Sequence, residues 1–121
     1  MNFDELISKI IAFRDERDWK QFHNSKDLAI ALNIETSELL ELFLWKDNED
    51  VNKGKLKEEL ADVLMYALLL AEKHQLNIEE IIKNKLEINK QKDLPKNTTN
   101  YNIYRQAIDL FHEFQYISIF F

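Results

Sequence analysis

The sequence contains no cysteine, and among its 121 residues it has one glycine (Gly54) and one proline (Pro95). The absence of cysteine excludes a disulfide framework and a thiolate metal site, and it fits a reducing compartment. The scarcity of glycine and proline argues against a turn-rich β fold, because tight turns depend on these two residues. The composition therefore predicts an all-α chain of long helices joined by few loops.

The sequence also lacks a long hydrophobic segment and an excess of positive charge. The apolar run Met65–Ala71 is too short to span a bilayer, and residues 1–5 lack the basic-then-apolar build of a secretion signal. We therefore expect a cytoplasmic protein with no membrane partner. The 16 Lys and Arg against 22 Asp and Glu give a formal net charge of −6, which disfavours a nucleic-acid polymer as partner. A small nucleotide is not disfavoured, since a metal ion can bridge its phosphates to an acidic protein.

Apolar periodicity predicts five helices in one small domain whose core would benefit from oligomerisation. We expect Ser25 to cap the second helix and residues 47–54 to form a loop that ends at Gly54. The predicted helices cover approximately residues 3–17, 26–46, 55–74 and 78–92, with a fifth after residue 102. The predicted division is a domain over residues 1–95, followed by a linker and a C-terminal helix of unknown role over residues 96–121.

The C-terminal helix is amphipathic in the sequence. Its apolar residues follow a 4-3-4-3 spacing: Ile103, Ala107, Leu110, Phe114 and Ile117. This spacing predicts a fifth helix or a partner-binding segment. The end of the chain, residues 116–121, is apolar, uncharged and strand-prone, so we expect it to be buried, for example against another subunit.

Two short acidic motifs are the main chemical signal. Glu35-Thr-Ser-Glu38 and Glu59-Leu-Ala-Asp62 each place two carboxylates at i and i+3, on one helix face. Both motifs interrupt an apolar stripe, where an uncompensated charge is costly, and carboxylates brought together raise one another's pKa values. A bound divalent cation removes both problems, and carboxylate oxygens suit Mg²⁺, with Mn²⁺ as an alternative.

The loop between the two motif-bearing helices favours an antiparallel pair, in which the two motifs face each other. Glu41 adds one more i+3 step and is interpreted as a further ligand, a general base or a surface residue. The alternative for both motifs is a solvated helix face whose acids form salt bridges with lysines.

These motifs resemble the MazG-like all-α nucleoside triphosphate pyrophosphohydrolases, in particular their dCTP pyrophosphatase branch. The resemblance covers roughly residues 3–95 and includes the two tryptophan motifs as well as the acids. The segments that carry it are Arg17–His23, Glu38–Trp45, Glu58–Tyr66 and Lys85–Gln91.

The resemblance implies a role for each matching position. The Mg²⁺ ligands would be Glu35, Glu38, Glu59 and Asp62. The substrate-binding residues would be Trp19 and Trp45 around the base, Phe22 and His23 at its rim, Tyr66 on the nucleotide, and Lys85 and Asn89 on the phosphates or sugar. The family further implies a four-helix bundle that works as a dimer or tetramer, and cleavage of a nucleotide to its monophosphate and pyrophosphate.

Several alternatives stay open at this point. Glu38 or Glu41 is the candidate general base. The resemblance implies dCTP or a related pyrimidine deoxynucleotide as the substrate. Ile10 stands where some family members carry a histidine that touches the base, which leaves the preference for cytosine open, with dUTP or a damaged purine nucleotide as alternatives. A catalytically silent helical interaction module is the alternative to an enzyme. Without the resemblance, Trp45 reads as a core residue, and Lys85 and Asn89 as solvent-facing ones.

Overall fold

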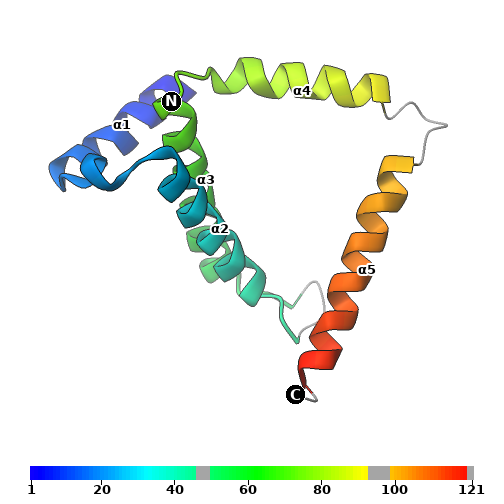
Figure 1. Cartoon of the computed structure of the whole chain (residues 1–121). Helices are drawn as coiled ribbons and strands as arrows, with labels where there is room; N and C mark the ends of the chain where they lie inside the picture. Colours follow the sequence, from blue (N-terminus) through cyan, green and yellow to red (C-terminus); the bar gives the residue numbers. More distant parts are fainter. Residues whose placement is uncertain (46–49, 93–98, 120–121) are drawn as a thin grey trace. The chain divides into compact units, whose positions relative to one another are not determined.

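The structure is a computed structural model that describes residues 1–45, 50–92 and 99–119. Helices are the only regular secondary structure in these ranges, which confirms the all-α fold. The elements are α1 (Phe3–Glu16), the 3-10 helix η1 (Trp19–Phe22), α2 (Ser25–Glu41), α3 (Lys53–Lys73), α4 (Ile78–Lys92) and α5 (Thr99–Ile119), as Figure 1 shows.

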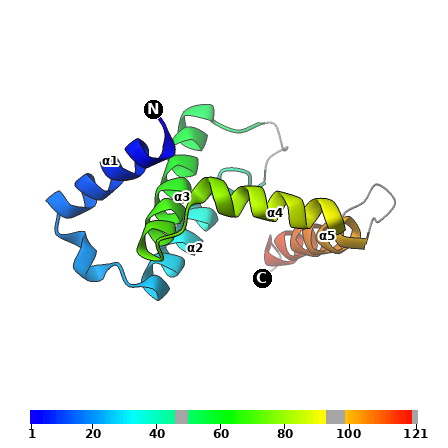
Figure 2. The ribbon, with the colours of Figure 1, turned by 90° about the horizontal axis from the view of Figure 1, so that it is seen from above.

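The chain forms two compact units, Met1–Glu79 and Glu80–Phe121. In the first unit, α2 and α3 are the most extensively packed helix pair, and they run antiparallel side by side (Figures 1 and 2). Helix α1 packs on α3 and leads into η1. The second unit contains α5 and nearly all of α4. The predicted division into residues 1–95 and 96–121 stays a prediction.

Asparagine side chains cap the N-termini of the first three α-helices. Asn2 accepts a hydrogen bond from the Glu5 N–H at 2.9 Å, and Asn24 accepts one from the Asp27 N–H at 2.8 Å. Asn24 therefore caps α2, and the prediction that Ser25 does so was wrong by one residue. Asn52 likewise accepts from the Lys55 N–H at 3.2 Å, so α3 starts before Gly54 and the predicted loop ends earlier. Both corrections follow from the short polar side chain of asparagine, which satisfies a free N–H of the first turn.

Helix α2 ends at Glu41, five residues before the predicted end. The Phe43 N–H donates to the Leu40 carbonyl at 3.0 Å and the Leu44 N–H to the Glu41 carbonyl at 3.3 Å. These tighter i to i−3 bonds replace the α-helical ladder. Trp45 then has φ of 63°, a left-handed conformation that stops the helix. Lys46, the predicted end, lies outside the described residues.

Helix α5 begins at Thr99, inside the stretch 96–102 that was predicted to be a linker. The rest of that stretch, residues 96–98, lies outside the described residues, as does Pro95. The backbone stays helical to Ile119, so the strand-prone end of the chain is helical up to that residue. The predicted burial of residues 116–121 falls on side chains outside those described.

The core of the described chain is small. The buried apolar residues are Leu28, Leu68, Leu69 and Ala71. On α3, the large apolar side chains of Leu60, Leu64 and Met65 are exposed. None of the described helices combines the length and the apolar character that crossing a membrane requires.

Candidate metal centre

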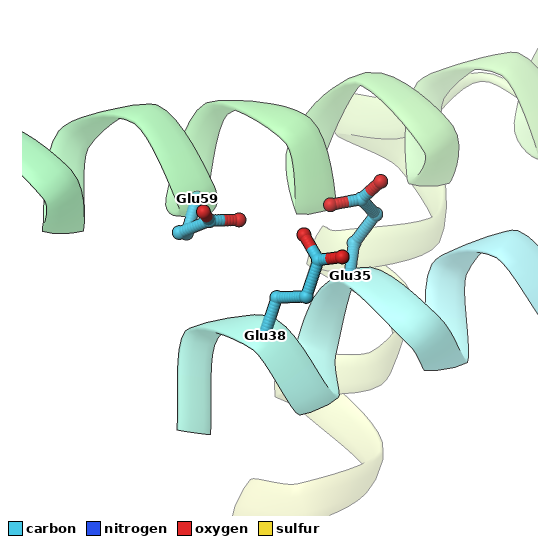
Figure 3. Close-up of side chains that lie close together, drawn as sticks. All are labelled: Glu35, Glu38 and Glu59. Atoms are coloured by element: carbon cyan, nitrogen blue, oxygen red, sulfur yellow. The ribbon is translucent and has the colours of Figure 1, made fainter. Parts of the chain in front are cut away.

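Three of the four predicted metal ligands lie close together. Glu35 and Glu38 extend from α2 and Glu59 from the facing side of α3 (Figure 3). One carboxylate oxygen from each residue lies within 4.8 Å of the other two. The antiparallel pairing of α2 and α3 produces this cluster, because it sets the two acidic motifs opposite each other. Glu35, Glu38 and Glu59 are called the acidic cluster below.

Two oxygens of the acidic cluster are buried and find no hydrogen-bond partner among the described residues: Glu35 Oε2 and Glu59 Oε2. Burial raises the pKa of Glu35, and the charges of Glu38 and Asp62 raise it further. Burial likewise raises the pKa of Glu59, followed by the charges of Glu38 and Asp62. Asp62 is therefore close enough to act on both buried carboxylates. Unpartnered buried carboxylate oxygens are costly unless a cation or a proton satisfies them.

The donor set fits a hard divalent cation. The three carboxylates of the cluster, with half-buried Asp62 beside them, provide only oxygen ligands. Oxygen ligands are those preferred by Mg²⁺ and Mn²⁺, whereas zinc sites are built mainly from His and Cys. A cation at this position would neutralise the mutual repulsion that raises the two pKa values.

Tyr66 and His23 extend the site away from the acidic cluster. Tyr66 follows Asp62 by one turn of α3, and its pKa is raised by burial and then by the charges of Glu35 and Asp62. The His23 ring lies edge-on to the Tyr66 ring, with centroids 6.3 Å apart. Tyr66 thus lies near the acids and also contacts the histidine.

His23 carries a third unsatisfied polar atom. Its Nδ1 is buried and has no hydrogen-bond partner in the part of the chain that the structure describes. Burial lowers the pKa of His23, and the charges of Arg14 and Lys73 lower it further. The ring is therefore neutral at pH 7, with one nitrogen as donor and the other as acceptor. A ligand lying along Tyr66 can supply the missing partner of Nδ1.

The predicted aromatic residues Trp19, Phe22 and Trp45 are exposed. Trp19 packs edge-on against Phe13 with centroids 5.6 Å apart, and the Arg17 guanidinium lies 3.5 Å from the centroid of the Phe13 ring. Phe22, in the same 3-10 helix, is exposed. Trp45 exposes 60% of its surface, which argues against the alternative that it is a core residue of this chain.

The remaining predicted site residues are Glu41, Lys85 and Asn89. Glu41 is the last residue of α2; it is exposed and is not a member of the cluster. Lys85 and Asn89 are exposed on α4, in the second unit. Their roles stay predictions.

Arg14 is a buried charged residue that the sequence reasoning missed. It is 6% exposed, and its guanidinium donates to Asp15 at 2.9 Å and to Glu72 of α3 at 3.2 Å. A signal was present in the sequence, because Arg14 follows Ile10 by four residues and Ile11 by three. That spacing puts the arginine on the apolar face of α1.

Comparisons with known proteins identify the family of the chain. The profile of the MazG-like family matches residues 30–106, which reaches beyond Pro95 into α5. The chain is 33% identical to dCTP pyrophosphatase 1 of Mus musculus over 112 aligned residues, covering 74% of the chain and 66% of the mouse protein. It is 40% identical to the Homo sapiens protein of that name over 88 residues, covering 66% of the chain and 52% of the human protein.

A solved structure is also similar. The crystal structure of a pyrophosphatase from Archaeoglobus fulgidus matches with a TM-score of 0.71 and 39% sequence identity, over 75% of this chain and 91% of that protein. The chain spans about half to two thirds of the length of the mammalian relatives. Because the family profile matches more than half of the chain, the chain belongs to the MazG-like family.

Proposed function

We propose that this protein is a divalent-metal-dependent nucleoside triphosphate pyrophosphohydrolase. The substrate we propose is dCTP or a related pyrimidine deoxynucleotide, and the products are the monophosphate and pyrophosphate. The observation that carries the proposal is the acidic cluster with its two buried, unpartnered oxygens. Relatives named dCTP pyrophosphatase support the reaction and the substrate.

The acidic cluster and Asp62 would hold the metal ion, for which we propose Mg²⁺, with Mn²⁺ as an alternative. A bound cation supplies charge neutralisation on the triphosphate and acts as a Lewis acid. Phosphoryl transfer depends mostly on positioning and electrostatics, so no covalent nucleophile is required. The part left to the chain is to orient the attacking water and accept its proton, and Glu38 or Glu41 is our candidate for this general base.

The aromatic residues and the histidine would bind the nucleoside. Trp19 and Trp45 offer exposed ring faces, and stacking of a base on such a ring contributes about 1–3 kcal/mol. His23 Nδ1 would exchange a hydrogen bond with the base or sugar, since none of the described residues satisfies it. Tyr66 would contact the nucleotide between the histidine and the acids.

We also propose that the working enzyme is a dimer or tetramer. The exposed stripe of Leu60, Leu64 and Met65 on α3 supports self-association, because water disfavours a contiguous apolar surface. Lys85 and Asn89 would reach the phosphates or the sugar in such an assembly. A cytoplasmic location stays a prediction.

The experiment that tests the reaction is pyrophosphate release from a panel of deoxynucleoside and nucleoside triphosphates, with Mg²⁺, with Mn²⁺ and with EDTA. We expect metal-dependent release with dCTP or another pyrimidine deoxynucleotide as the preferred substrate. A preference for dUTP or a damaged purine nucleotide would support the proposed reaction and show that the proposed substrate is wrong. No release by folded protein with either metal would contradict the proposal and favour a silent interaction module.

A further inference from the structure

Helix α5 exposes a wide apolar surface. Five large apolar side chains between residues 103 and 111 each expose 45–72% of their surface: Ile103, Tyr104, Ile108, Leu110 and Phe111. At 100° per residue they fall within one half of the helix circumference. A surface of this kind on a helix normally has a partner.

The opposite side of α5 is polar and nearly neutral. Arg105 and Asp109 form an i, i+4 ion pair there, with 3.3 Å between Nε and Oδ1. Glu113 is exposed on the polar side as well. A single arginine in the described turns gives the helix no basic face, so an anionic membrane surface or a nucleic acid is a poor fit.

The spacing of the apolar residues suits a helical partner. Ile103, Ala107 and Leu110 follow the 4-3 rhythm of a heptad seam, and the sequence repeats it at Phe114 and Ile117. Tyr104 and Phe111 lie next to this seam, one residue after Ile103 and Leu110. A seam widened in this way is typical of a helix in a bundle. Most of it lies beyond residue 106, where the match to the family profile ends.

We propose that α5 is a self-association helix whose apolar face packs against α5 of further copies of this chain. The exposed apolar area of α5 is large enough to support pairing with a second copy of the helix. Taking roughly 150–250 Å² for a large side chain, the five exposed residues offer about 500 Å² per helix. A pair of helices then buries about 1,000 Å², which exceeds most lattice contacts and approaches a specific interface. The same face on each copy also makes the contact self-complementary.

Single-cysteine variants test the proposal cleanly, because the natural chain has no cysteine. Leu110→Cys places a thiol on the apolar face of the full-length protein, and Asp109→Cys places one on the opposite face, one residue away. A short bismaleimide is added at low protein concentration, and the covalent dimer is measured. We expect at least ten-fold more dimer from Leu110→Cys than from Asp109→Cys. Equal yields, or no dimer from Leu110→Cys, would overturn the proposal.

A second measurement covers the case in which the thiol is poorly placed. Leu110→Glu should reduce the mass measured by light scattering and leave the helical content unchanged. The mass should fall by about half if α5 joins two otherwise separate assemblies of the chain. Arg105→Gln changes the net charge by the same amount on the polar side and should keep the natural mass. An unchanged mass for Leu110→Glu, or binding of the natural protein to lipid vesicles that Leu110→Glu abolishes, would overturn the proposal. Neither readout uses turnover, so both are independent of the proposed reaction.

Discussion

At the residue scale, the acidic cluster makes the metal-free protein sensitive to pH. The pKa values of Glu35 and Glu59 are raised in the folded state above the ordinary value of 4.5. The folded state therefore binds more protons than the unfolded state above pH 4.5, and stability falls as pH rises through the raised pKa values. We expect the melting temperature in EDTA to decline over this window, and saturating Mg²⁺ to remove much of the decline.

A pair of neutral substitutions controls this pH prediction. Glu59→Gln removes one of the two half-buried carboxylates whose pKa values are raised, and it should flatten the decline of melting temperature measured in EDTA. Glu58→Gln removes the charge of the exposed neighbour, which is the smallest of the named contributions to the raised pKa of Glu59, and should change the decline much less. A melting temperature that rises with pH over this window, or equal behaviour of the two variants, would contradict the explanation.

The exposed indole of Trp45 leads to a prediction about binding. If it stacks on the base in both the ground state and the transition state, Trp45→Ala should raise KM with little change in kcat. The loss of about 1–3 kcal/mol of stacking corresponds to an increase in KM of roughly 5- to 150-fold. Steady-state kinetics on the preferred substrate check this, with Phe3→Ala, another exposed aromatic residue, as the control. A change confined to kcat would argue against the stacking role.

At the scale of secondary-structure elements, Arg14 joins α1 to α3 through Glu72. Because Arg14 is buried while Glu72 and Asp15 are partly exposed, most of the cost of Arg14→Ala should come from lost packing and lost hydrogen bonds. We expect a decrease of about 1–3 kcal/mol in the free energy of unfolding, measured in urea. Arg105→Ala breaks the exposed ion pair of α5 and should cost at most about 0.5 kcal/mol. Equal costs for the two variants would show that burial of Arg14 does not matter.

The sequence predicted the helices better than their ends. Periodicity located all five α-helices, since a repeated apolar face identifies a helix over many residues. The end of α2 was missed because Leu42, Phe43 and Leu44 continue the apolar run although the backbone has left the helix. The start of α3 was missed because Gly54 was taken as a loop residue, while the cap at Asn52 decides the boundary.

The candidate site was predictable to the extent that helix spacing controls it. The i, i+3 pairs predicted that Glu35 and Glu38 share a face, and the short loop predicted that Glu59 would oppose them. Spacing within one helix did not show that Arg14 pairs with Glu72, because that contact joins residues 58 positions apart. Nor does spacing decide what faces Lys85 and Asn89, since that depends on how whole units associate.

At the scale of the whole molecule, few described residues are buried and many large apolar side chains are exposed. Burial of apolar surface is the main favourable term in folding, so a chain with such a small core should depend on association. We expect the melting temperature to rise with protein concentration, because subunit binding stabilises only the folded state. Differential scanning calorimetry over a hundred-fold range of concentration checks this, and a constant melting temperature with a monomeric mass would contradict self-association.

The central claim is that the acidic cluster supports metal-dependent hydrolysis of a nucleoside triphosphate. The most direct test compares pyrophosphate release by the Glu59→Gln and Glu58→Gln variants, with Mg²⁺ and the preferred substrate. The helical content of both variants is first shown to match that of the natural protein. Loss of a charge-stabilising contribution of several kcal/mol should lower kcat/KM of Glu59→Gln by more than about 100-fold. Glu58→Gln should retain the natural rate within about two-fold, since a surface substitution changes little. Comparable activity of the two variants would contradict the claim.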